Sequence, residues 1–594
     1  MADNSKDDFG TDLNSVEVPV EIPVDLGLPE FGSDAVVDLL GKLGYKFIAI
    51  NPGSSFRGLH DSIVNHHGNK DPKLLLCLHE EVAVSLAHGY AKASTTPIAV
   101  AIHDLVGLMH ASMAVYDTFV DRTALLILGG SGPRDRYKRR PIDWIHSADS
   151  QAQLIREFVK WDDEPSPSSA FVPSVMKAHQ IAHSWPYGPT YVSLDCALQE
   201  EEVDEQAELD IDPTRYPSLP TITPDPVVIA KIAEVLCSTQ NPLVIGGRIS
   251  RIPSISEALE SLVEKLGAAY IDERNSVSFP TAHHLNCNGL DSMIDQADVI
   301  LSIDVSDLPS LLERKGSTSA AGKFIIDLSF GDIDAKSWSN NSSLLSPRDI
   351  HLICDPLLGI RAITKELAKS LDSDSVQLRT NFIRAKVNEF RKERDADQKR
   401  HLDDAPISQV RLVSELWNAV KDIDWLLLLR NTRTWPEGIW NFTGSGQFLG
   451  HSGGGGVGYG PGAMVGGALA AQEQGKLGVG IIGDGDFLMA SSALWTATHY
   501  RIPMLMVVND NNSFYNDEPH QARVAKRRGR PVDNSWIGMR ISDPAINISE
   551  LARSYGCWLI GPIDDPSKLK DAVKQGLKAA VSGKTAVVHV LTAR

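Results

Sequence analysis

The sequence has few of the features that mark secreted, membrane-spanning or nucleic-acid-binding proteins. Its six cysteines are scattered without CxxC spacing, so neither a disulfide framework nor a zinc site is expected. No apolar run approaches the roughly 18 residues of a membrane span, and the opening MADNSKDDFGTDLNSVEVPVEIP lacks the basic-then-apolar pattern of a secretion signal. The formal charge of −19 argues against general nucleic-acid binding. We therefore expect a reducing, cytoplasmic location, with neither a membrane nor a nucleic acid as partner.

Three blocks of alternating strands and helices make up most of the chain. A chain of 594 residues is too long for one hydrophobic core. In each block, short apolar runs such as YKFIAI, NPLVIGG and IPMLMVV alternate with helical patterns, which indicates buried parallel sheets. The sequence therefore predicts an α/β protein with three doubly wound parallel-sheet domains. We expect a flexible acidic tail at residues 1–28 and domains at residues 29–200, 220–372 and 395–594.

An aspartate and a group of asparagines follow two consecutive strands of the last block. Asp484 comes directly after LGVGIIG, and NDNN (509–512) follows IPMLMVV one helix later. A right-handed crossover between parallel strands brings both to the same edge of the sheet. Carboxylate, amide and carbonyl oxygens are the ligands that suit Mg²⁺. Backbone N–H groups around Gly483 and Gly485, and in the glycine turn HSGGGGVGYGPG, would suit phosphate oxygens.

This segment resembles the diphosphate-binding motif of thiamine-diphosphate-dependent enzymes, in which GDG is followed one βαβ unit later by an asparagine pair. The resemblance implies thiamine diphosphate and Mg²⁺ as cofactors, with the metal held by Asp484, Asn511 and the carbonyl of Ser513. Because this sequence has NDNN where the family has a pair of asparagines, Asn509 and Asn512 are alternative ligands. The nearby ALWTA, which resembles benzoylformate decarboxylase, favours Asn511.

A glutamate in the first block resembles the residue with which this family activates the cofactor. Glu80 follows the strand LLLCL and begins the helical stretch EEVAVSLAHGYAKA, where the family has DGYA in place of HGYA. The resemblance implies that Glu80 hydrogen-bonds the aminopyrimidine ring and so promotes loss of the proton on C2. Glu81 is the adjacent alternative, and an acid in a first helical turn also has the simpler role of a favourable charge near the helix dipole.

Further positions follow from the same resemblance. Val457, next to Gly456 in GGVGYG, matches the bulky apolar residue that bends the cofactor, although core packing explains a valine equally well. Thr432, after the strand DWLLLL, lies where relatives place a hydroxyl near the diphosphate. NPGSS resembles the turn that places a serine in the active site of benzoylformate decarboxylase, and this implies a role for Ser54.

Three histidines lie close to these positions in the sequence. His103 ends the strand AVAI, where benzoylformate decarboxylase has a catalytic histidine, and imidazole can transfer protons near neutral pH. A structural role at the strand end is the alternative. His110 is expected to pack in the following helix, and His79 could point either way. The basic run RVAKRRGRPV (523–532) is interpreted as solvated surface, a substrate contact or a subunit contact.

The order of the three domains resembles the acetolactate synthase and benzoylformate decarboxylase group, with a pyrimidine-binding, a central and a diphosphate-binding domain. This implies a lyase or carboligase acting on a small 2-oxo acid or related carbonyl compound, as a homodimer or homotetramer. A 2-hydroxyacyl-CoA or acyloin lyase and a non-catalytic cofactor-binding homologue are the alternatives. The central block lacks a G-x-G-x-x-G pattern after VIGG, so we expect no FAD.

Overall fold

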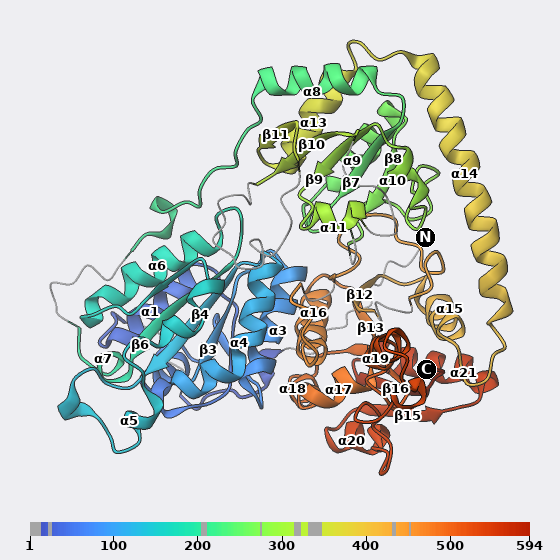
Figure 1. Ribbon diagram of the computed structural model, residues 1–594. Coiled ribbons are helices and arrows are strands. Elements are labelled where there is room, and N and C mark those ends of the chain that lie inside the picture. Colours follow the sequence, from blue (N-terminus) through green and yellow to red (C-terminus); the bar gives the residue numbers. More distant parts are fainter. Residues whose placement is uncertain are drawn as a thin grey trace, which may run out of the picture. The chain divides into compact units, whose positions relative to one another are not determined.

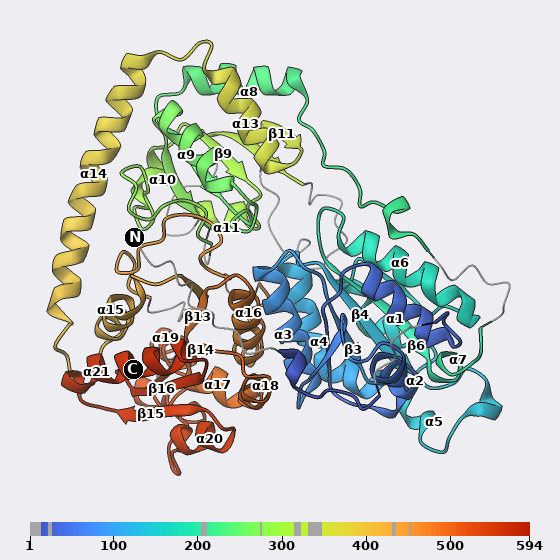
Figure 2. The same ribbon diagram turned by 180° about the vertical axis from the view of Figure 1, so that it is seen from behind.

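Three parallel sheets, each with helices on both faces, form the protein, which Figures 1 and 2 show as a computed structural model. The structure describes residues 13–21, 27–203, 211–273, 276–313, 322–330, 347–430, 435–450 and 453–594. Two compact units are present: Met1–Leu219 with Ala405–Thr434 and Ser452–Arg594, and Pro220–Asp404 with Trp435–His451. The predicted α/β class with three parallel sheets is confirmed.

The first sheet has six strands in the order β2-β1-β3-β4-β6-β5. Its elements are α1 (Gly32–Lys42), β1 (Phe47–Ile50), α2 (Arg57–Asp61), β2 (Lys73–Leu76), α3 (Glu80–Ala93), β3 (Ile98–Ile102), α4 (Asp104–Val120), β4 (Leu125–Ser131), α5 (Asp143–His146), β5 (Trp161–Asp163), α6 (Phe171–Ala182), β6 (Pro189–Asp195) and α7 (Cys196–Gln199). Helices α1 and α6 cover one face and α3 and α4 the other (Figures 1 and 2). The chain reverses its direction of winding between β1 and β3, and ligands of such sheets bind at this switch point.

The third sheet belongs to the same unit and has the order β12-β13-β14-β16-β15. Its elements are α15 (Gln409–Val420), β12 (Trp425–Leu429), α16 (Gly460–Glu473), β13 (Leu477–Gly483), α17 (Asp484–Ala490), α18 (Ala493–His499), β14 (Met504–Asp510), α19 (Asp517–Arg527), α20 (Ile548–Ser554), β15 (Trp558–Ile563), α21 (Pro566–Val581) and β16 (Thr585–Leu591). Strands β12 and β14 are buried along their whole length, and β13 along all but its last residue, as expected for apolar runs covered on both faces.

Helices α3 and α16 join the first and third sheets through a close crossing. Glycines make this approach possible, because a Cβ on Gly89 would lie 2.1 Å from the carbonyl oxygen of Ala463, and one on Gly466 would lie 1.8 Å from that of Leu86. At the same boundary, the hydroxyl of Thr496 in α18 donates to the carbonyl of Leu76, the last residue of β2 (2.9 Å). The first and third sheets are therefore packed against each other within one unit.

The second sheet, with the order β11-β10-β9-β7-β8, forms the other unit. Its elements are α8 (Pro226–Ser238), β7 (Pro242–Gly246), α9 (Ile255–Leu266), β8 (Ala269–Asp272), α10 (Ser292–Gln296), β9 (Val299–Ile303), α11 (Leu308–Glu313), β10 (Phe324–Ser329), β11 (Ile350–Ile353), α13 (Pro356–Leu367) and the long α14 (Ser373–Arg400). The segment Trp435–His451 belongs to this unit, although it follows β12 of the third sheet in the sequence.

Part of the segment expected as a tail contacts the body of the first unit. The hydroxyl of Tyr500 donates to Glu17 (2.8 Å), and the side-chain amide of Asn69 donates to the carbonyl of Glu17 (3.0 Å). Across the described residues, every helix is too short or too polar to span a bilayer.

Candidate functional site

The carboxyl edge of the third sheet brings the predicted metal ligands together. Strands β13 and β14 pair in parallel with Gly483 opposite Asn509, so the residues that follow each strand emerge side by side. The backbone N–H of Ser513 donates both to Oδ2 of Asp484 (3.0 Å) and to Oδ1 of Asn511 (3.0 Å). The two side-chain oxygens therefore converge on one point.

The other two asparagines of NDNN lie differently. Asn509 is the penultimate residue of β14 and is buried, and its side-chain oxygen accepts a hydrogen bond from Gln409 of α15 (2.6 Å). Asn512 has a left-handed backbone conformation with φ of 54°, which turns the chain after Asn511. Of the three asparagines, Asn511 is the one whose side-chain oxygen shares a donor with Asp484.

A second buried carboxyl group, Asp510, lies beside Asp484. Burial and the neighbouring Asp510 raise the pKa of Asp484 to about 7. Burial alone would also raise the pKa of Asp510, but hydrogen bonds from His589 and from the N–H of Asn512 lower it. Ser549 in turn hydrogen-bonds Nδ1 of His589 (2.9 Å). A divalent cation would offset the repulsion between the two carboxyl groups, and the oxygen-only donors fit Mg²⁺.

Asp486 ties the glycine turn to the start of α17. Its Oδ1 accepts hydrogen bonds from the N–H groups of Gly458 (2.6 Å) and Gly460 (3.3 Å), and burial raises its pKa to about 6. Gly458 has φ of 102°, which a residue with a side chain rarely adopts. Val457 is thereby held at the surface beside α17. The sequence analysis did not consider Asp486, although a second aspartate two residues after Asp484 indicated a further candidate for the site.

The glycines of the motif differ in what surrounds them. A Cβ on Gly485 would lie 2.5 Å from the ring of Phe514, whereas a Cβ on Gly483 would meet no atom within 4 Å. A Cβ on Gly456 would lie 2.2 Å from Sδ of Met113 in α4. The glycine turn therefore lies against α4 of the first sheet. Thr432, the predicted hydroxyl neighbour of the diphosphate, lies outside the described residues.

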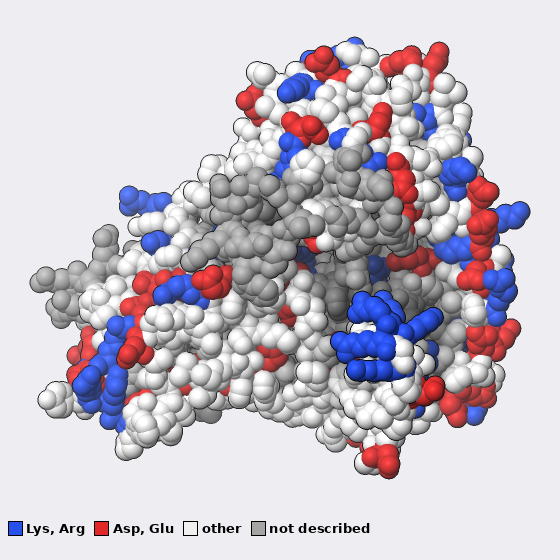
Figure 3. Space-filling model, in the orientation of Figure 1, with Lys and Arg blue, Asp and Glu red and all other residues white. Residues whose placement is uncertain are grey.

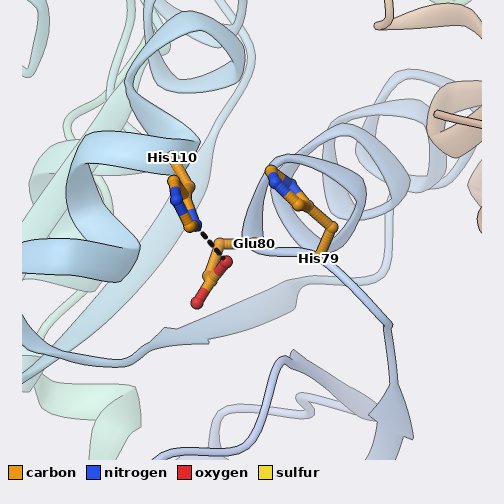
Figure 4. Close-up of side chains that lie close together, drawn as sticks. All are labelled: His79, Glu80 and His110. Atoms are coloured by element: carbon orange, nitrogen blue, oxygen red, sulfur yellow. Dashed lines mark hydrogen bonds and ion pairs between the residues drawn. The ribbon is translucent and has the colours of Figure 1, made fainter. Parts of the chain in front are cut away.

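At the first sheet, Glu80 and two histidines form a compact cluster (Figure 4). A hydrogen bond joins Oε2 of Glu80 and Nδ1 of His110 (2.9 Å), and the rings of His110 and His79 are stacked with centroids 4.9 Å apart. His79 also caps α3, since its Nδ1 accepts the N–H of Glu81 (3.1 Å). Gly107 of α4 makes room for the carboxyl group, because a Cβ there would lie 3.0 Å from Oε1 of Glu80.

Glu81, the alternative to Glu80, lies in a different environment. Its Oε2 accepts the backbone N–H of Ala114 in α4 (3.2 Å), and burial raises its pKa to about 8, with the nearby Asp117 adding to the effect. Its carboxyl group is therefore held against the middle of α4. Glu80 is the one that contacts the partly exposed His110.

The switch point of the first sheet assembles a second cluster around His103. Nδ1 of His103 hydrogen-bonds the hydroxyl of Ser55 (2.8 Å), and its Nε2 lies 3.3 Å from Oδ2 of Asp104, which His146 also contacts at 3.5 Å. Burial lowers the pKa of His103, against the opposing charge of Asp104. The imidazole is therefore kept neutral near pH 7, as a proton acceptor requires.

Ser54 lies beside this cluster but does not make the contact with His103. It is exposed, and its hydroxyl accepts a hydrogen bond from Arg140 (3.0 Å), which also pairs with Asp143 (2.8 Å). Two residues that the sequence analysis did not single out, Ser55 and His146, are thus the ones around His103. No motif marked His146, whereas Ser55 was adjacent to the serine that the resemblance indicated.

The basic run forms an exposed patch on and after α19. Figure 3 shows its blue side chains gathered on one face, and the members are Arg523, Lys526, Arg527, Arg528 and Arg530. Helix α19 begins four residues after Ser513, so the patch follows the metal motif directly in the chain.

The chain is similar to thiamine-diphosphate-dependent enzymes in sequence and in fold. Residues 31–154 match the family model of the thiamine pyrophosphate enzyme N-terminal TPP binding domain, and residues 431–590 match that of the C-terminal TPP binding domain. Benzoylformate decarboxylase of Pseudomonas aeruginosa is 24% identical over 75% of this chain and 80% of its own. The acetolactate synthase large subunit of Lactococcus lactis is 22% identical over 93% and 91%.

Solved structures show the same fold. The thiamine diphosphate-dependent 4-hydroxybenzoylformate decarboxylase of Rhodococcus jostii superposes with a TM-score of 0.74 at 19% identity, covering 95% of this chain and 99% of that chain. Residues 31–154 and 431–590 therefore carry the two cofactor-binding domains of the thiamine-diphosphate-dependent enzyme family.

Proposed function

We propose that the protein is a Mg²⁺- and thiamine-diphosphate-dependent enzyme that decarboxylates a 2-oxo acid and either releases an aldehyde or joins the fragment to a second carbonyl compound. The observation that supports this best is the convergence of the Asp484 and Asn511 side-chain oxygens on the N–H of Ser513. That arrangement offers hard oxygen ligands at the start of α17, beside backbone N–H groups suited to a diphosphate.

In this proposal, residues of the third sheet bind the cofactor and its cation, and residues of the first sheet transfer protons. Asp484, Asn511 and the carbonyl of Ser513 would hold the cation, and the glycine turn fixed by Asp486 would present Gly456 and Val457 to the cofactor. When bound, thiamine diphosphate supplies a carbon nucleophile and an electron sink. Glu80 would exchange a proton with the pyrimidine ring through its buried carboxyl group.

His103 is proposed to act on the substrate. Its lowered pKa favours the neutral imidazole, and the hydroxyl of Ser55 fixes the ring through Nδ1. A neutral imidazole at the carboxyl edge of the sheet can take up a proton from a substrate hydroxyl or return one to carbon. Ser54 and Arg140, which contact each other at the surface, would lie at the entrance to that site.

The chemistry named for the relatives supports a 2-oxo acid substrate, since the relatives are benzoylformate decarboxylases and acetolactate synthases. The test is a panel of aliphatic and aromatic 2-oxo acids assayed for CO₂ release, with and without acceptor aldehydes, in the presence of Mg²⁺ and thiamine diphosphate. We expect cofactor-dependent CO₂ release from at least one member, without added FAD. Tight cofactor binding with neither CO₂ release nor C2–H exchange would instead identify a non-catalytic homologue.

A further inference from the structure

We propose that Asp510 adds a second carboxylate to the cation site, that His589 positions it there, and that the site can therefore bind a divalent cation before thiamine diphosphate. This inference rests on the proposed function, in which Asp484 and Asn511 hold the cation. It concerns the order in which the cation and the diphosphate bind. Asp510 is the acidic member of NDNN, so the proposal depends on a residue of this chain's own motif.

Three neighbouring strands bring two carboxyl groups and an imidazole into one row. In the third sheet β14 lies between β13 and β16 (Figure 1), so Asp510, the last residue of β14, has Asp484 on one side and His589 of β16 on the other. The carboxyl groups of Asp510 and Asp484 lie in hydrogen-bond contact. A hydrogen bond joins Nε2 of His589 and Oδ2 of Asp510 (2.8 Å). All three side chains are buried, so the sheet and its interior set this row.

His589 is itself fixed, which lets it hold the carboxyl group of Asp510. Its Nδ1 hydrogen-bonds the hydroxyl of Ser549 in α20 (2.9 Å), and both side chains are buried. When the hydroxyl of Ser549 donates to Nδ1, the Nε2–H of the imidazole faces Asp510. The backbone N–H of Asn512 donates to the other oxygen, Oδ1 of Asp510 (2.8 Å). Donors on both oxygens therefore hold Asp510 beside Asp484, against the repulsion between the two carboxylates.

A second carboxylate changes what the cation site requires from the diphosphate. Mg²⁺ is commonly bound by one or two carboxylates together with phosphate oxygens, and the affinity of oxygen sites for cations depends on the number of charged ligands. Asp484 and Asp510 together can balance the charge of a divalent cation, and a low-dielectric interior strengthens this attraction. Asp510 can contribute through its charge without being a direct ligand. The diphosphate would then bind to a site that already carries the cation.

The test is a titration of the full chain with Mn²⁺, which takes the same oxygen ligands as Mg²⁺. Free Mn²⁺ is measured by electron paramagnetic resonance, first without thiamine diphosphate. Wild-type protein should bind a single Mn²⁺ per chain. Asp510→Asn keeps the size of the side chain but removes its charge, and it should weaken this binding by about 10–100-fold, the usual cost of losing an outer-shell partner. Asp571→Asn, at an exposed acid of α21, should bind Mn²⁺ as the wild type does.

The same titration with saturating thiamine diphosphate separates a role at the cation from a role in the fold. Asp510→Asn should then bind Mn²⁺ nearly as tightly as the wild type, because diphosphate oxygens supply the missing charge. Equal losses with and without the diphosphate would identify a purely structural role and overturn the inference. Wild-type protein that binds Mn²⁺ only together with the diphosphate would overturn it too, as would unchanged Mn²⁺ binding in Asp510→Asn.

Two variants of His589 test its positioning role. His589→Ala removes the N–H that holds Asp510 and should weaken Mn²⁺ binding without the diphosphate, as Asp510→Asn does. His589→Gln still offers an amide N–H and should restore most of the loss. Equal Mn²⁺ affinities in the two His589 variants would refute this role.

Failure of this inference is distinguishable from failure of the proposed function. CO₂ release by a protein that binds Mn²⁺ only together with thiamine diphosphate would refute the inference alone. Mn²⁺ binding without the diphosphate, in a protein that releases CO₂ from no 2-oxo acid, would refute the proposed function and leave the inference standing.

Discussion

Buried carboxyl groups occupy both halves of the site, and each has a different partner. Glu80 is hydrogen-bonded to the imidazole of His110, and Glu81 accepts a hydrogen bond from the backbone of α4. Asp484 accepts one from the N–H of Ser513, and Asp486 accepts one from the glycine turn. Burying an acid penalises its charged form, so a buried carboxyl group needs a hydrogen-bond donor, a cation or a proton. The single-residue changes below separate these roles.

Asp484→Ala should abolish tight, Mg²⁺-dependent binding of thiamine diphosphate. The change removes the anionic oxygen that lies with Asn511 around the N–H of Ser513. Affinity should fall by more than about 100-fold, beyond the 10–100-fold typical of losing an outer-shell partner. Calorimetric titration measures this, with Asp517→Ala, an exposed acid of α19, as the control. Unchanged affinity would place the metal site elsewhere.

Glu80 and His103 should control different steps of the reaction. Glu80→Gln should slow C2–H exchange and every step after it, because Glu80 works on the cofactor before substrate arrives. His103→Ala should leave exchange near wild type and lower turnover by roughly 10²–10⁴-fold. Exchange and turnover measured in both variants give four values. Normal turnover in His103→Ala would make this histidine structural, and normal exchange in Glu80→Gln would remove Glu80 from the mechanism.

Glu81 should make the stability of the fold depend on pH. Burial raises its pKa to about 8 in the folded protein from 4.5. Between these values the folded chain keeps a proton that the unfolded chain releases, so stability falls as the pH rises towards 8. Melting temperatures should therefore decline across this window, and Glu81→Gln should flatten the decline. Glu393→Gln, an exposed glutamate of α14, should not. Parallel curves for both variants would contradict the assignment.

At the scale of residues, sequence motifs indicated the neighbourhood of the site better than its individual contacts. Glu80, His103, Asp484 and Asn511 all lie at the carboxyl edges of their sheets, as the strand pattern required. Which serine faces His103 depends on the turn after β1, and a sequence pattern does not give the direction of a side chain in a turn. The contact between Glu80 and His110 depends on how α3 and α4 pack, which is also a tertiary property.

At the scale of elements, apolar runs identified the strands that are buried on both faces. Three strands, β5, β6 and β15, are not marked by such runs. β5 has three residues, two of them aspartates, and β15 is an edge strand that contains glycine and proline and shifts register between Ile560 and Ile563. β6 is fully buried but mixes threonine and serine with its apolar residues. Short or mixed strands give weak periodic signals, and pairing with neighbours stabilises them.

The crossing of α3 and α16 should depend on Gly466. A Cβ at this position would lie 1.8 Å from the carbonyl oxygen of Leu86, and a helix backbone cannot move aside as a side chain can. Gly466→Ala should therefore destabilise the unit by about 1–3 kcal/mol, the usual cost of overpacking. Scanning calorimetry measures the loss. Gly576→Ala, where the Cβ would meet side-chain atoms of Val588 at 2.6 Å, should cost less, and an equal loss would contradict this explanation.

At the scale of the whole molecule, exposed apolar side chains flank both halves of the site. Leu78 and Met109 are the sequence neighbours of His79 and His110, and Val457 and Met489 lie at the glycine turn and on α17. These four side chains are between 43% and 60% exposed. Exposed apolar groups beside a site commonly mark a surface that a partner or ligand covers. We propose that a second copy of the chain covers them, in a homodimer or a homotetramer.

This proposal predicts a specific effect of charge at the covered surface. Light scattering of the wild-type protein should give at least twice the 64.7 kDa of one chain. Met109→Glu places a carboxylate where apolar contact is expected, and burying an unpaired charge is costly, so this variant should shift towards the monomer and lose activity with it. Val227→Glu, at the exposed start of α8, should leave the mass unchanged. A fully active wild-type monomer would refute the proposal, because each chain would then complete its own site.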